Sequence, residues 1–418
     1  MTVLISGAGI AGLTLGLTLH QIGVPFRIYE AVRSLRPLGV GINLQPNAVR
    51  EMIEMGLQDL LDEVGLRTRD YGLYSKTGRE IWTEPRGLEA GYRWPQYSVH
   101  RGAFQVALAR ELMARAGADC IATGAPGVGY RVKDGKAVLR LKDGTEVVGD
   151  ALVAADGIHS AVRAQMYPDE GPPIWGGAIL WRGTTLAVPY LSGASMVLAG
   201  HDTQRLVSYP ITAPDAQTGK ALINWIAEIT VDPTKGWRKE DWNRTANIEE
   251  FLPAFQDWKF DWLDVPAMIR AADQVLEYPM VDRDPVESWT DGPVCLIGDA
   301  AHPTYPVGSN GASQAIVDAR VLGVALLAHG VSPAAFATFE AEVRPRTTKV
   351  AYANRSAGPL GVLQTVEDRT AGVFEKIEDV MSHAELAEHA QTYKRIAGFD
   401  IEMLNARAPL IDPVRYPF

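Results

Sequence analysis

The sequence predicts an α/β protein in which a largely parallel sheet, a mostly antiparallel sheet and a helical region follow one another. Three observations support this class. A β-branched strand, a glycine-rich turn and a helix open the chain. Strand patterns rich in Trp, Val, Tyr and Thr extend from residue 176 to about residue 230. The chain after residue 299 has a predominantly helical pattern.

The composition is that of an ordinary globular protein. Of 418 residues, 47% are hydrophobic and 22% charged, which is enough to bury a large core. The net charge of −10 argues against a nucleic-acid partner, because that association depends on basic surfaces. The two cysteines, Cys120 and Cys295, are too few for a disulfide framework or a zinc site. We therefore expect a cytoplasmic protein without a metal.

The first 26 residues carry no charged side chain, so a membrane segment has to be considered. No basic stretch precedes them, and five glycines interrupt them. We therefore expect a strand at residues 3–5 and a helix at about 11–21 that ends at Gly23. No later segment has the pattern of a membrane span, so we expect no membrane partner.

A second strand, at residues 25–30, completes a βαβ unit and ends at Glu30. The elements expected next, in chain order, are short helices within 47–63, a hairpin at 71–83, a helix at 102–116, a β-meander at 129–153 and a buried strand at 151–155. The antiparallel strands follow at 178–186, 195–198, 206–211 and 222–230. A segment carrying Trp237, Trp242, Trp258 and Trp262 is expected to be helical, with the tryptophans as core or interface anchors.

Residues 7–12 have the spacing G-x-G-x-x-G, directly between the first strand and the first helix. Such glycines permit a tight turn, and the helix N-terminus can hold a pyrophosphate. Glu30 lies 18 residues beyond Gly12, where a carboxylate can accept hydrogen bonds from an adenosine ribose. These features together indicate dinucleotide binding. A glycine turn with a purely structural role is the alternative.

A second motif bears on which dinucleotide is bound. The apolar run 294–297 ends at Gly298-Asp299 and is followed by Pro306, Gly308 and Gly311. An aspartate in this position can bind a ribityl hydroxyl, and the N-terminus of the next helix can stabilise negative charge on a reduced ring. The motif therefore favours FAD, with an ordinary N-capped helix as the alternative.

Three segments, residues 7–12, 155–163 and 298–311, resemble the fingerprints of the single-component FAD-dependent aromatic hydroxylases of the p-hydroxybenzoate hydroxylase type. Their order and wide separation match as well, and the resemblance covers roughly residues 1–355. Further stretches are most similar to the phenazine hydroxylases of this family, at 36–43, 95–102, 181–183, 278–285 and 310–314.

The resemblance implies a glutathione-reductase-type FAD-binding fold with an inserted, mostly antiparallel β-sheet substrate domain and a helical C-terminal region. The expected FAD-binding domain is discontinuous, at 1–75, 100–175 and 276–350. The expected substrate domain comprises 76–99 and 176–275, and the helical region 351–418.

The resemblance also implies a tightly but non-covalently bound FAD, with NADH or NADPH as a transient co-substrate. The residues that it implies at the cofactor are Gly7, Gly9, Gly12, Glu30, Gly41, Arg101, Gln105, Asp156, Gly157, Asp299, Pro306, Gly308 and Gly311. Asp156 and Gly157, together with Arg163, would serve both FAD and the reductant.

The implied reaction is hydroxylation of a small polyaromatic or heteroaromatic acid or phenol by O2, through a flavin 4a-hydroperoxide, with or without loss of a carboxylate. It requires neither a metal nor a nucleophilic side chain. Two alternatives stay open: a flavoprotein oxidase or reductase that inserts no oxygen, and a flavin-binding regulatory module without turnover. A monomer and a homodimer are both compatible with the sequence.

No residue is assigned with certainty to the chemical step, and the candidates are Pro306, His302, Tyr209 and Arg182. We expect His302 to pack near the flavin loop rather than act as a base. Arg182 could pair with a substrate carboxylate or form an internal salt bridge. Strand alternation sends half of each strand to a ligand face without showing which half, and this applies to His201, Tyr209, Asn224 and Trp225.

Overall fold

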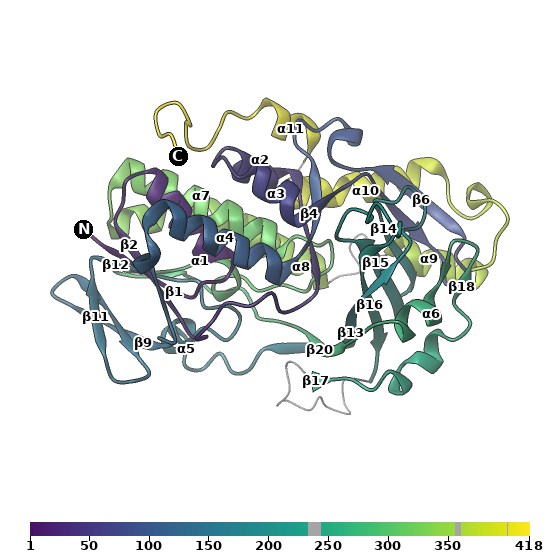
Figure 1. Cartoon of the computed structure of the whole chain (residues 1–418), viewed down its shortest axis with the longest axis horizontal. Helices are drawn as coiled ribbons and strands as arrows, with labels where there is room; N and C mark the ends of the chain where they lie inside the picture. Colours follow the sequence, from purple (N-terminus) through teal and green to yellow (C-terminus); the bar gives the residue numbers. More distant parts are fainter. Residues whose placement is uncertain (233–243, 356–360, 399) are drawn as a thin grey trace.

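Two β-sheets lie side by side in the computed structural model, which describes residues 1–418 except 233–243, 356–360 and 399. The parallel sheet with its covering helices occupies the left of Figure 1, and the larger antiparallel sheet occupies the right. Trp237 and Trp242 lie outside the described residues.

The first sheet has six strands in the order β21-β22-β12-β1-β2-β8. Their bounds are Thr290–Asp291, Val294–Leu296, Ala151–Ala154, Val3–Ser6, Phe26–Glu30 and Ile121–Thr123, in that order. Neighbouring strands from β22 to β8 pair in parallel, and β21 pairs antiparallel at the edge. Strands β1, β12 and β22 are buried along their whole length, which explains their continuous apolar sequences.

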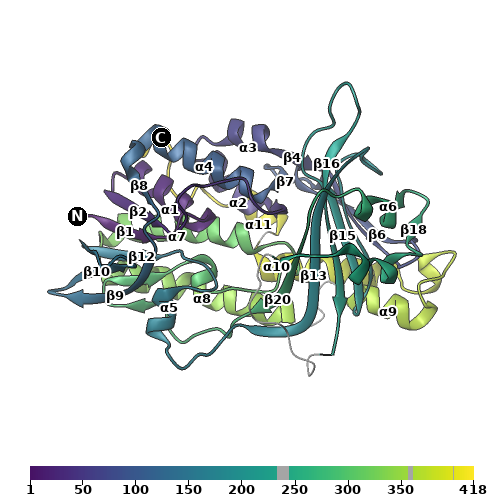
Figure 2. The ribbon, with the colours of Figure 1, turned by 60° about the horizontal axis from the view of Figure 1, so that its bottom comes forward.

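Helices and a β-meander cover this sheet (Figures 1 and 2). The helices are α1 (Ile10–Gln21), α4 (Arg101–Ala116), α5 (Ala161–Met166), α7 (Gly311–His329) and α8 (Pro333–Arg355). The meander consists of β9 (Gly127–Lys133), β10 (Lys136–Leu141) and β11 (Glu146–Gly149), as the Asp-Gly turns predict. Among the described residues α7 alone is long and apolar enough to cross a membrane, yet 72% of its apolar window is buried inside the fold, as in the core helix of a soluble protein.

A small three-stranded sheet, in the order β3-β7-β4, lies between the two large sheets. The strands are β3 (Gly41–Leu44), β7 (Gln96–His100) and β4 (Gly65–Thr68). The short helices α2 (Pro46–Ile53) and α3 (Gln58–Val64) follow β3, as the apolar spacing in residues 47–63 predicts.

The eight-stranded sheet has the order β17-β20-β13-β16-β15-β14-β5-β6. Its strands are Arg244–Thr245, Val275–Asp282, Ile174–Ala187, Ala221–Thr230, Gln204–Pro210, Ser195–His201, Asp70–Tyr74 and Glu80–Pro85, in that order. Only β14 and β5 pair in parallel, so the expectation of a mostly antiparallel sheet is met.

One face of this sheet forms a core with the segment that contains the described tryptophans. Trp225 and Leu206 are buried there with Phe251 and Trp258, and Trp262 packs against them. The expected helical character of this segment is wrong for most of its described length. It contains the 3-10 helices Ile248–Glu250 and Leu252–Phe255, the hairpin β18 (Lys259–Phe260) and β19 (Leu263–Asp264), and the single α-helix α6 (Val265–Arg270).

Backbone pairing crosses the domain boundaries expected from the sequence. Strand β5, expected within 1–75, and most of β20, expected within 276–350, are members of the eight-stranded sheet. Strand β7, expected within 76–99, pairs with β3 and β4. Periodicity reveals that a strand exists but not its partner, so we propose domain boundaries that follow the pairing.

The C-terminal region is helical in its described residues, with α9 (Gly361–Thr370), α10 (His383–Ala397) and α11 (Ile401–Ala406). Helix α9 contacts strand β14, and the chain then returns along the top of Figure 1 to the first sheet. There the carbonyl oxygen of Tyr416 accepts a hydrogen bond from Gln21, at 2.8 Å. The remaining 3-10 helices are Gly87–Ala90, Ala118–Cys120, Gly298–Ala300 and Ile377–Asp379.

We expect Gly12→Ala to destabilise the cofactor-free protein by about 1–3 kcal/mol, the usual cost of overpacking. A Cβ atom at Gly12 would lie 2.0 Å from the carbonyl oxygen of Gly7, and neither backbone can move freely. Gly9→Ala is the matched control, because the nearest atom to a Cβ there is 4.0 Å away. Thermal unfolding of both variants measures the difference, and equal melting temperatures would contradict the packing argument.

Candidate functional site

The three sequence motifs meet at one edge of the parallel sheet. In the register, Ser6 is paired with Ala154 and Ala154 with Leu296, so the segments that follow these strands leave the sheet together. They contain Gly7, Asp156 and Asp299 respectively. Ligands bind at this edge in open α/β sheets because the connecting loops converge there.

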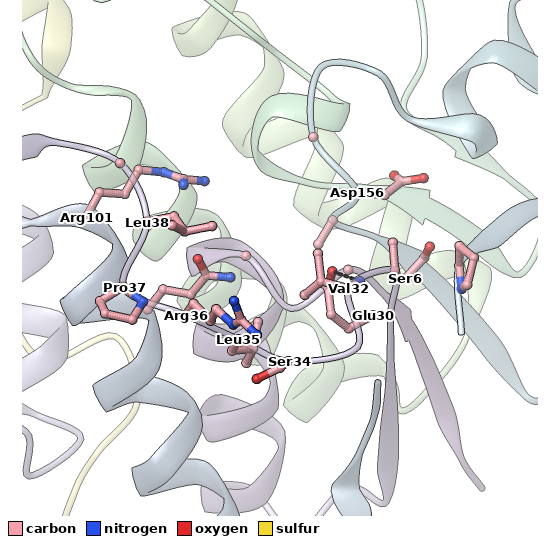
Figure 3. Close-up of a pocket in the computed structure, with 18 of the residues that line it drawn as sticks. Ser6, Glu30, Val32, Ser34, Leu35, Arg36, Pro37, Leu38, Arg101 and Asp156 are labelled. Atoms are coloured by element: carbon pink, nitrogen blue, oxygen red, sulfur yellow. Dashed lines mark hydrogen bonds between the residues drawn. The ribbon is translucent and has the colours of Figure 1, made fainter. Parts of the chain in front are cut away.

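A hollow of about 690 Å³ lies beside the first two of these segments (Figure 3). Among the residues lining it are Gly7, Gly9, Glu30, Arg36, Arg101, Gln105, Asp156, Gly157 and Tyr278. In Figure 3 Arg101 extends into the hollow from one side, and Asp156 stands on the opposite side. Seven of the expected cofactor residues therefore line one space.

The glycine turn has the geometry of a phosphate cradle. Gly7 has a φ of +101°, and a Cβ atom there would lie 2.5 Å from the carbonyl oxygen of Ala155. Gly9, at the N-cap of α1, has open space where its Cβ would be. The first turn of α1 therefore presents backbone N–H groups that a pyrophosphate can approach. The residues present fit FAD at this position.

Glu30 and Gln105 both bind the backbone of Ala8, the residue between the two glycines. Glu30 Oε2 accepts a hydrogen bond from the Ala8 amide at 2.6 Å, and Oε1 accepts one from the Val32 amide at 2.9 Å. Gln105 Nε2 donates to the Ala8 carbonyl oxygen at 2.7 Å. These side chains fix the turn while remaining in the lining of the hollow.

Asp156 has one oxygen in use and one free. Its Oδ2 accepts from the Ala161 amide at 3.1 Å, whereas Oδ1 is buried with no partner in the described structure. Burial raises the pKa of this carboxyl group, although hydrogen bonds from Ser160 and neighbouring backbone oppose the rise. An unsatisfied buried acceptor costs free energy, so a ligand hydroxyl at Oδ1 would be favourable.

Arg163 is not among the residues that line the hollow, and the role at FAD and the reductant that the resemblance implies stays a prediction. Its side chain is 1% exposed, and it donates to the carbonyl oxygens of Ala300 and Ala301 at 3.1 and 2.6 Å. It also forms an ion pair with Glu170. Arg163 therefore ties the second motif to the third, and its effect on a cofactor would be indirect.

Asp299 lies in the 3-10 helix after β22, with an exposed side chain. Desolvation by the surrounding protein raises its pKa, while the positive charges of His302 and Arg101 oppose the rise. Arg101 is exposed too, and no described carboxylate forms an ion pair with it. Burial raises the pKa of Tyr278, and the charges of Arg182 and Arg101 oppose that rise. The charge of Arg101 therefore acts on both Asp299 and Tyr278.

His302 is anchored by Asp318 of helix α7. Its Nε2 lies 2.6 Å from Asp318 Oδ2, which also accepts from the Gly298 amide at 2.9 Å. Burial would lower the pKa of His302, but Asp318 outweighs burial and raises it. The ring packs on Trp289, and His302 is absent from the linings of the hollow and of the second cavity. Its contacts hold the Gly298 loop.

The second cavity, of about 100 Å³, lies between the eight-stranded sheet and the loop 306–309. It is lined by Gln45, Tyr71, Arg86, Gln96, Leu180, Met196, Leu198, Arg205, Val207, Tyr209, Ile226, Glu228, Met280, Pro306, Val307, Gly308 and Ser309. Alternation in the strands therefore places Arg205, Val207 and Tyr209 on the cavity face. Trp225 lies on the opposite face in the core, and His201 contacts Thr203 at 3.2 Å.

At Gly41 of strand β3, two side chains of the eight-stranded sheet bind the backbone. Asn224 Oδ1 accepts from the Gly41 amide at 2.7 Å, and Arg182 Nη2 donates to the Gly41 carbonyl oxygen at 3.1 Å. A Cβ at this position would lie 2.7 Å from Asn224 and 2.8 Å from Tyr209. This close approach requires a glycine whether or not a cofactor is bound.

Arg182 forms no ion pair with a described carboxylate, so the internal salt bridge considered from the sequence is not observed. Its guanidinium is buried, its Nε has no hydrogen-bond partner in the part of the chain that the structure describes, and burial lowers its pKa. Burial raises the pKa of the adjacent Tyr209 to about 12, with Arg182 opposing the rise. The Tyr209 hydroxyl is therefore a neutral hydrogen-bond donor at neutral pH rather than a base.

The loop before α7 brings Pro306 and Gly308 into the cavity and leaves Gly311 at the helix start. No atom lies within 4 Å of a Cβ placed at Gly311, so a ligand can approach the helix N-terminus. Asn310, beside it, has both side-chain polar atoms buried without a partner in the described structure. Ser313 Oγ accepts from the Gln45 amide at 2.9 Å.

Sequence reasoning missed several cavity residues: Gln45, Tyr71, Arg86, Gln96, Arg205 and Glu228. Every second residue of strand β15 faces the cavity, so Arg205 is predicted to line it once Tyr209 is known to do so. Pairing of β15 with β16 then points to Glu228, which is opposite Arg205. No comparable signal identifies Arg86, which follows the edge strand β6.

We expect His302→Gln to destabilise the protein by about 1.5–3 kcal/mol, the contribution of a buried hydrogen bond to a charged group. Because the folded pKa of His302 is raised, its stabilising effect is complete below the unfolded value near 6.5 and is lost as pH rises through the folded value. Denaturant unfolding of wild type and variant between about pH 5 and 9 tests this. A difference that is constant, or that grows with pH, would contradict the His302–Asp318 ion pair.

Comparisons with known proteins agree with this geometry. Residues 1–353 match the family model described as an FAD binding domain. The chain is 43% identical over 366 residues to the phenazine 1,6-dicarboxylic acid hydroxylase PhzS of Lysobacter antibioticus, covering 84% of this chain and 89% of that protein. It is 33% identical over 399 residues to the 3-amino-4-hydroxybenzoate 2-monooxygenase PtnB3 of Streptomyces platensis, covering 90% and 94%.

Solved structures support the fold. A salicylate hydroxylase in complex with its substrate superposes with a TM-score of 0.73 at 21% identity, covering 99% of this chain and 98% of that one. HpxO of Klebsiella pneumoniae, complexed with FAD and uric acid, gives 0.70 at 22% identity, covering 97% and 95%. The resemblance and the fold class expected from the three motifs are thus confirmed. The chain belongs to the FAD binding domain family and is one of its FAD-dependent aromatic-ring monooxygenases.

Proposed function

We propose that this enzyme hydroxylates a fused heteroaromatic carboxylic acid of the phenazine type, with O2 and NADH or NADPH as co-substrates. The observation that carries the substrate class is the second cavity, in which apolar side chains of the sheet face the loop 306–309 and two arginines stand in the wall. The 43% identity to a hydroxylase of a phenazine dicarboxylic acid supports the same class.

The cavity residues suit an aromatic ring with polar substituents. Leu180, Met196, Leu198, Val207, Ile226 and Met280 supply an apolar wall. The amide oxygens of Gln45 and Gln96 are buried without partners among the described residues and can accept hydrogen bonds from substrate donors. Bound FAD supplies the oxygen-transfer chemistry, and the protein positions the ring and excludes water around it.

The proposed cofactor contacts follow the placement of the residues. Gly7, Gly9 and the start of α1 would hold the pyrophosphate, with Gly12 allowing the helix to pack close to the turn. Glu30 would bind the adenosine ribose, and Arg101 would supply a positive charge. The other proposed contacts are Gln105, Asp156, Gly157 and Asp299, with Gly41, Pro306, Gly308 and Gly311 shaping the loops at the flavin.

The reductant is proposed to bind transiently. No second glycine-rich phosphate turn is present in the sequence, so NADH or NADPH would share the space around Arg101 and Asp156. Dependence on a soluble reductant, and cysteines that are free and buried, support a cytoplasmic location.

We expect Asp299→Ala to weaken FAD binding about ten- to a hundredfold, because a hydrogen bond to a charged acceptor contributes roughly 1.5–3 kcal/mol. Titration of the cofactor-free protein with FAD, followed by flavin fluorescence, measures the change. Asp257→Ala, at an exposed position in the other sheet's covering segment, is the control. Unchanged affinity in Asp299→Ala would exclude Asp299 from the FAD contacts.

The proposed reaction predicts that phenazine-1-carboxylate stimulates NAD(P)H oxidation more than salicylate does, because the larger ring offers more apolar surface to the apolar wall of the cavity. Reaction under oxygen-18 gas is expected to give a product that carries one labelled oxygen atom, detected by mass spectrometry. Stimulated oxidation with hydrogen peroxide as the only oxygen product would contradict hydroxylation of this compound. A stronger response to salicylate would contradict the fused-ring substrate class.

A further inference from the structure

The second cavity is also lined by charged side chains that have no assigned role in the proposed reaction. Arg86, Arg205 and Glu228 line the cavity, beside Tyr71. The wall therefore contains two guanidinium groups and one carboxylate. Burying charge without compensation is costly, so the partners of each arginine decide what the cavity can bind.

Arg205 is fully compensated. It lies opposite Glu228 in the pairing of β15 with β16. Its Nε donates to Glu228 Oε1 at 3.0 Å, and Nη2 contacts the same oxygen. Both side chains are about nine-tenths buried, at 10% and 12% exposure. This pair is closed on itself and contributes no net charge to the cavity.

Arg86 is only partly compensated. Its Nη2 forms an ion pair with Glu84 Oε1 at 2.9 Å, and its guanidinium lies over the Tyr71 ring at 4.7 Å. Its Nε is buried and has no hydrogen-bond partner among the described residues. Stacking on an aromatic ring holds the planar guanidinium in a fixed orientation.

The carboxylate of Glu84 is shared between two cations. Its Oε2 accepts a hydrogen bond from Lys394 Nζ at 2.9 Å, and Lys394 is 7% exposed. Burial would raise the pKa of Glu84, but Arg86 and Lys394 outweigh burial and lower it. One carboxylate therefore neutralises only one of the two cations that touch it.

The group contains three cations, on Arg86, Arg205 and Lys394, and two carboxylates, on Glu84 and Glu228. It is largely buried and carries one excess positive charge. Asp400 is the next acidic residue and acts on Lys394 from a distance. Its Oδ1 accepts a hydrogen bond from the Met403 amide at the start of α11. No ion pair joins Asp400 to Arg86 in the described structure. Of the two cations that touch Glu84, Arg86 lines the second cavity and Lys394 does not.

We propose that Arg86 binds the carboxylate of the aromatic substrate and that Lys394 is a positioning residue, which holds Glu84 and so leaves Arg86 free for that carboxylate. This inference rests on the proposed function, whose substrate is an aromatic acid. Lys394 belongs to helix α10, beyond the segment 1–353 that matches the family model. The C-terminal region thereby contributes to substrate selection.

The experiment uses the FAD-loaded protein and two probes of nearly equal shape, phenazine-1-carboxylate and the neutral phenazine-1-carboxamide. Dissociation constants are obtained from the change in flavin absorbance. Wild type is expected to bind the carboxylate at least tenfold more tightly than the amide. Arg86→Met is expected to weaken the carboxylate about ten- to a hundredfold and to leave the amide nearly unchanged.

Lys394→Met tests the positioning role. With Lys394 removed, Glu84 pairs with Arg86 alone, so the carboxylate is expected to bind several-fold more weakly while the amide does not change. In turnover, KM for the acid is expected to rise at nearly constant kcat. Arg86→Lys is expected to keep part of the preference for the carboxylate over the amide. Arg79 is an exposed arginine in the β5–β6 hairpin, and Arg79→Met is expected to behave as wild type.

Equal weakening of both probes in Arg86→Met would overturn the carboxylate site, because a packing defect does not distinguish them. If Arg86→Met does not retain FAD, the test rests on Arg86→Lys and Lys394→Met. If both variants prefer the carboxylate over the amide by the same factor as wild type, the inference is overturned. A wild type that hydroxylates the acid without preferring it to the amide also overturns the inference but leaves the proposed function standing. A wild type that binds neither probe overturns both.

Discussion

The parallel pairing of β1, β12 and β22 is the constraint on which the proposed cofactor site depends. These strands come from the beginning, the middle and the later part of the chain, yet their register aligns Ser6, Ala154 and Leu296. The glycine turn, Asp156 and Asp299 therefore leave the sheet at one edge. The segments also pack closely, because a Cβ atom at Gly7 would lie only 2.5 Å from the carbonyl oxygen of Ala155.

Contacts between the eight-stranded sheet and strand β3 shape the proposed substrate side. Asn224 and Arg182 hold the backbone of Gly41, so strand β3 lies directly against the antiparallel sheet. The cavity between this sheet and the loop 306–309 combines apolar strand residues with buried polar atoms. Several of those atoms have no hydrogen-bond partner among the described residues, which is costly without a ligand and supports the proposal of a ring with polar substituents.

The C-terminal region connects both halves of the molecule. Helices α9 and α10 pack on the substrate-sheet side, where Lys394 reaches Glu84, and the last residues return to α1. Phe418 occupies the space beside Gly56, so a Cβ at Gly56 would lie 2.4 Å from its ring. A region without recognisable motifs thus contacts both the cofactor domain and the charged end of the cavity.

The sequence by itself determined the nucleotide-binding βαβ unit, the class of cofactor and the family, because these depend on local signals: glycine spacing, a strand ending in an acid and an aspartate after a buried strand. It also predicted the meander and the antiparallel character of the substrate sheet. Only the tertiary structure decided which strands pair, which half of each strand faces the cavity, and that Arg86, Glu84 and Lys394 meet. The reason is physical: strand alternation repeats locally, whereas register, facing and ion pairing depend on which segments the fold brings together, as with Glu84 and Lys394, which are 310 positions apart.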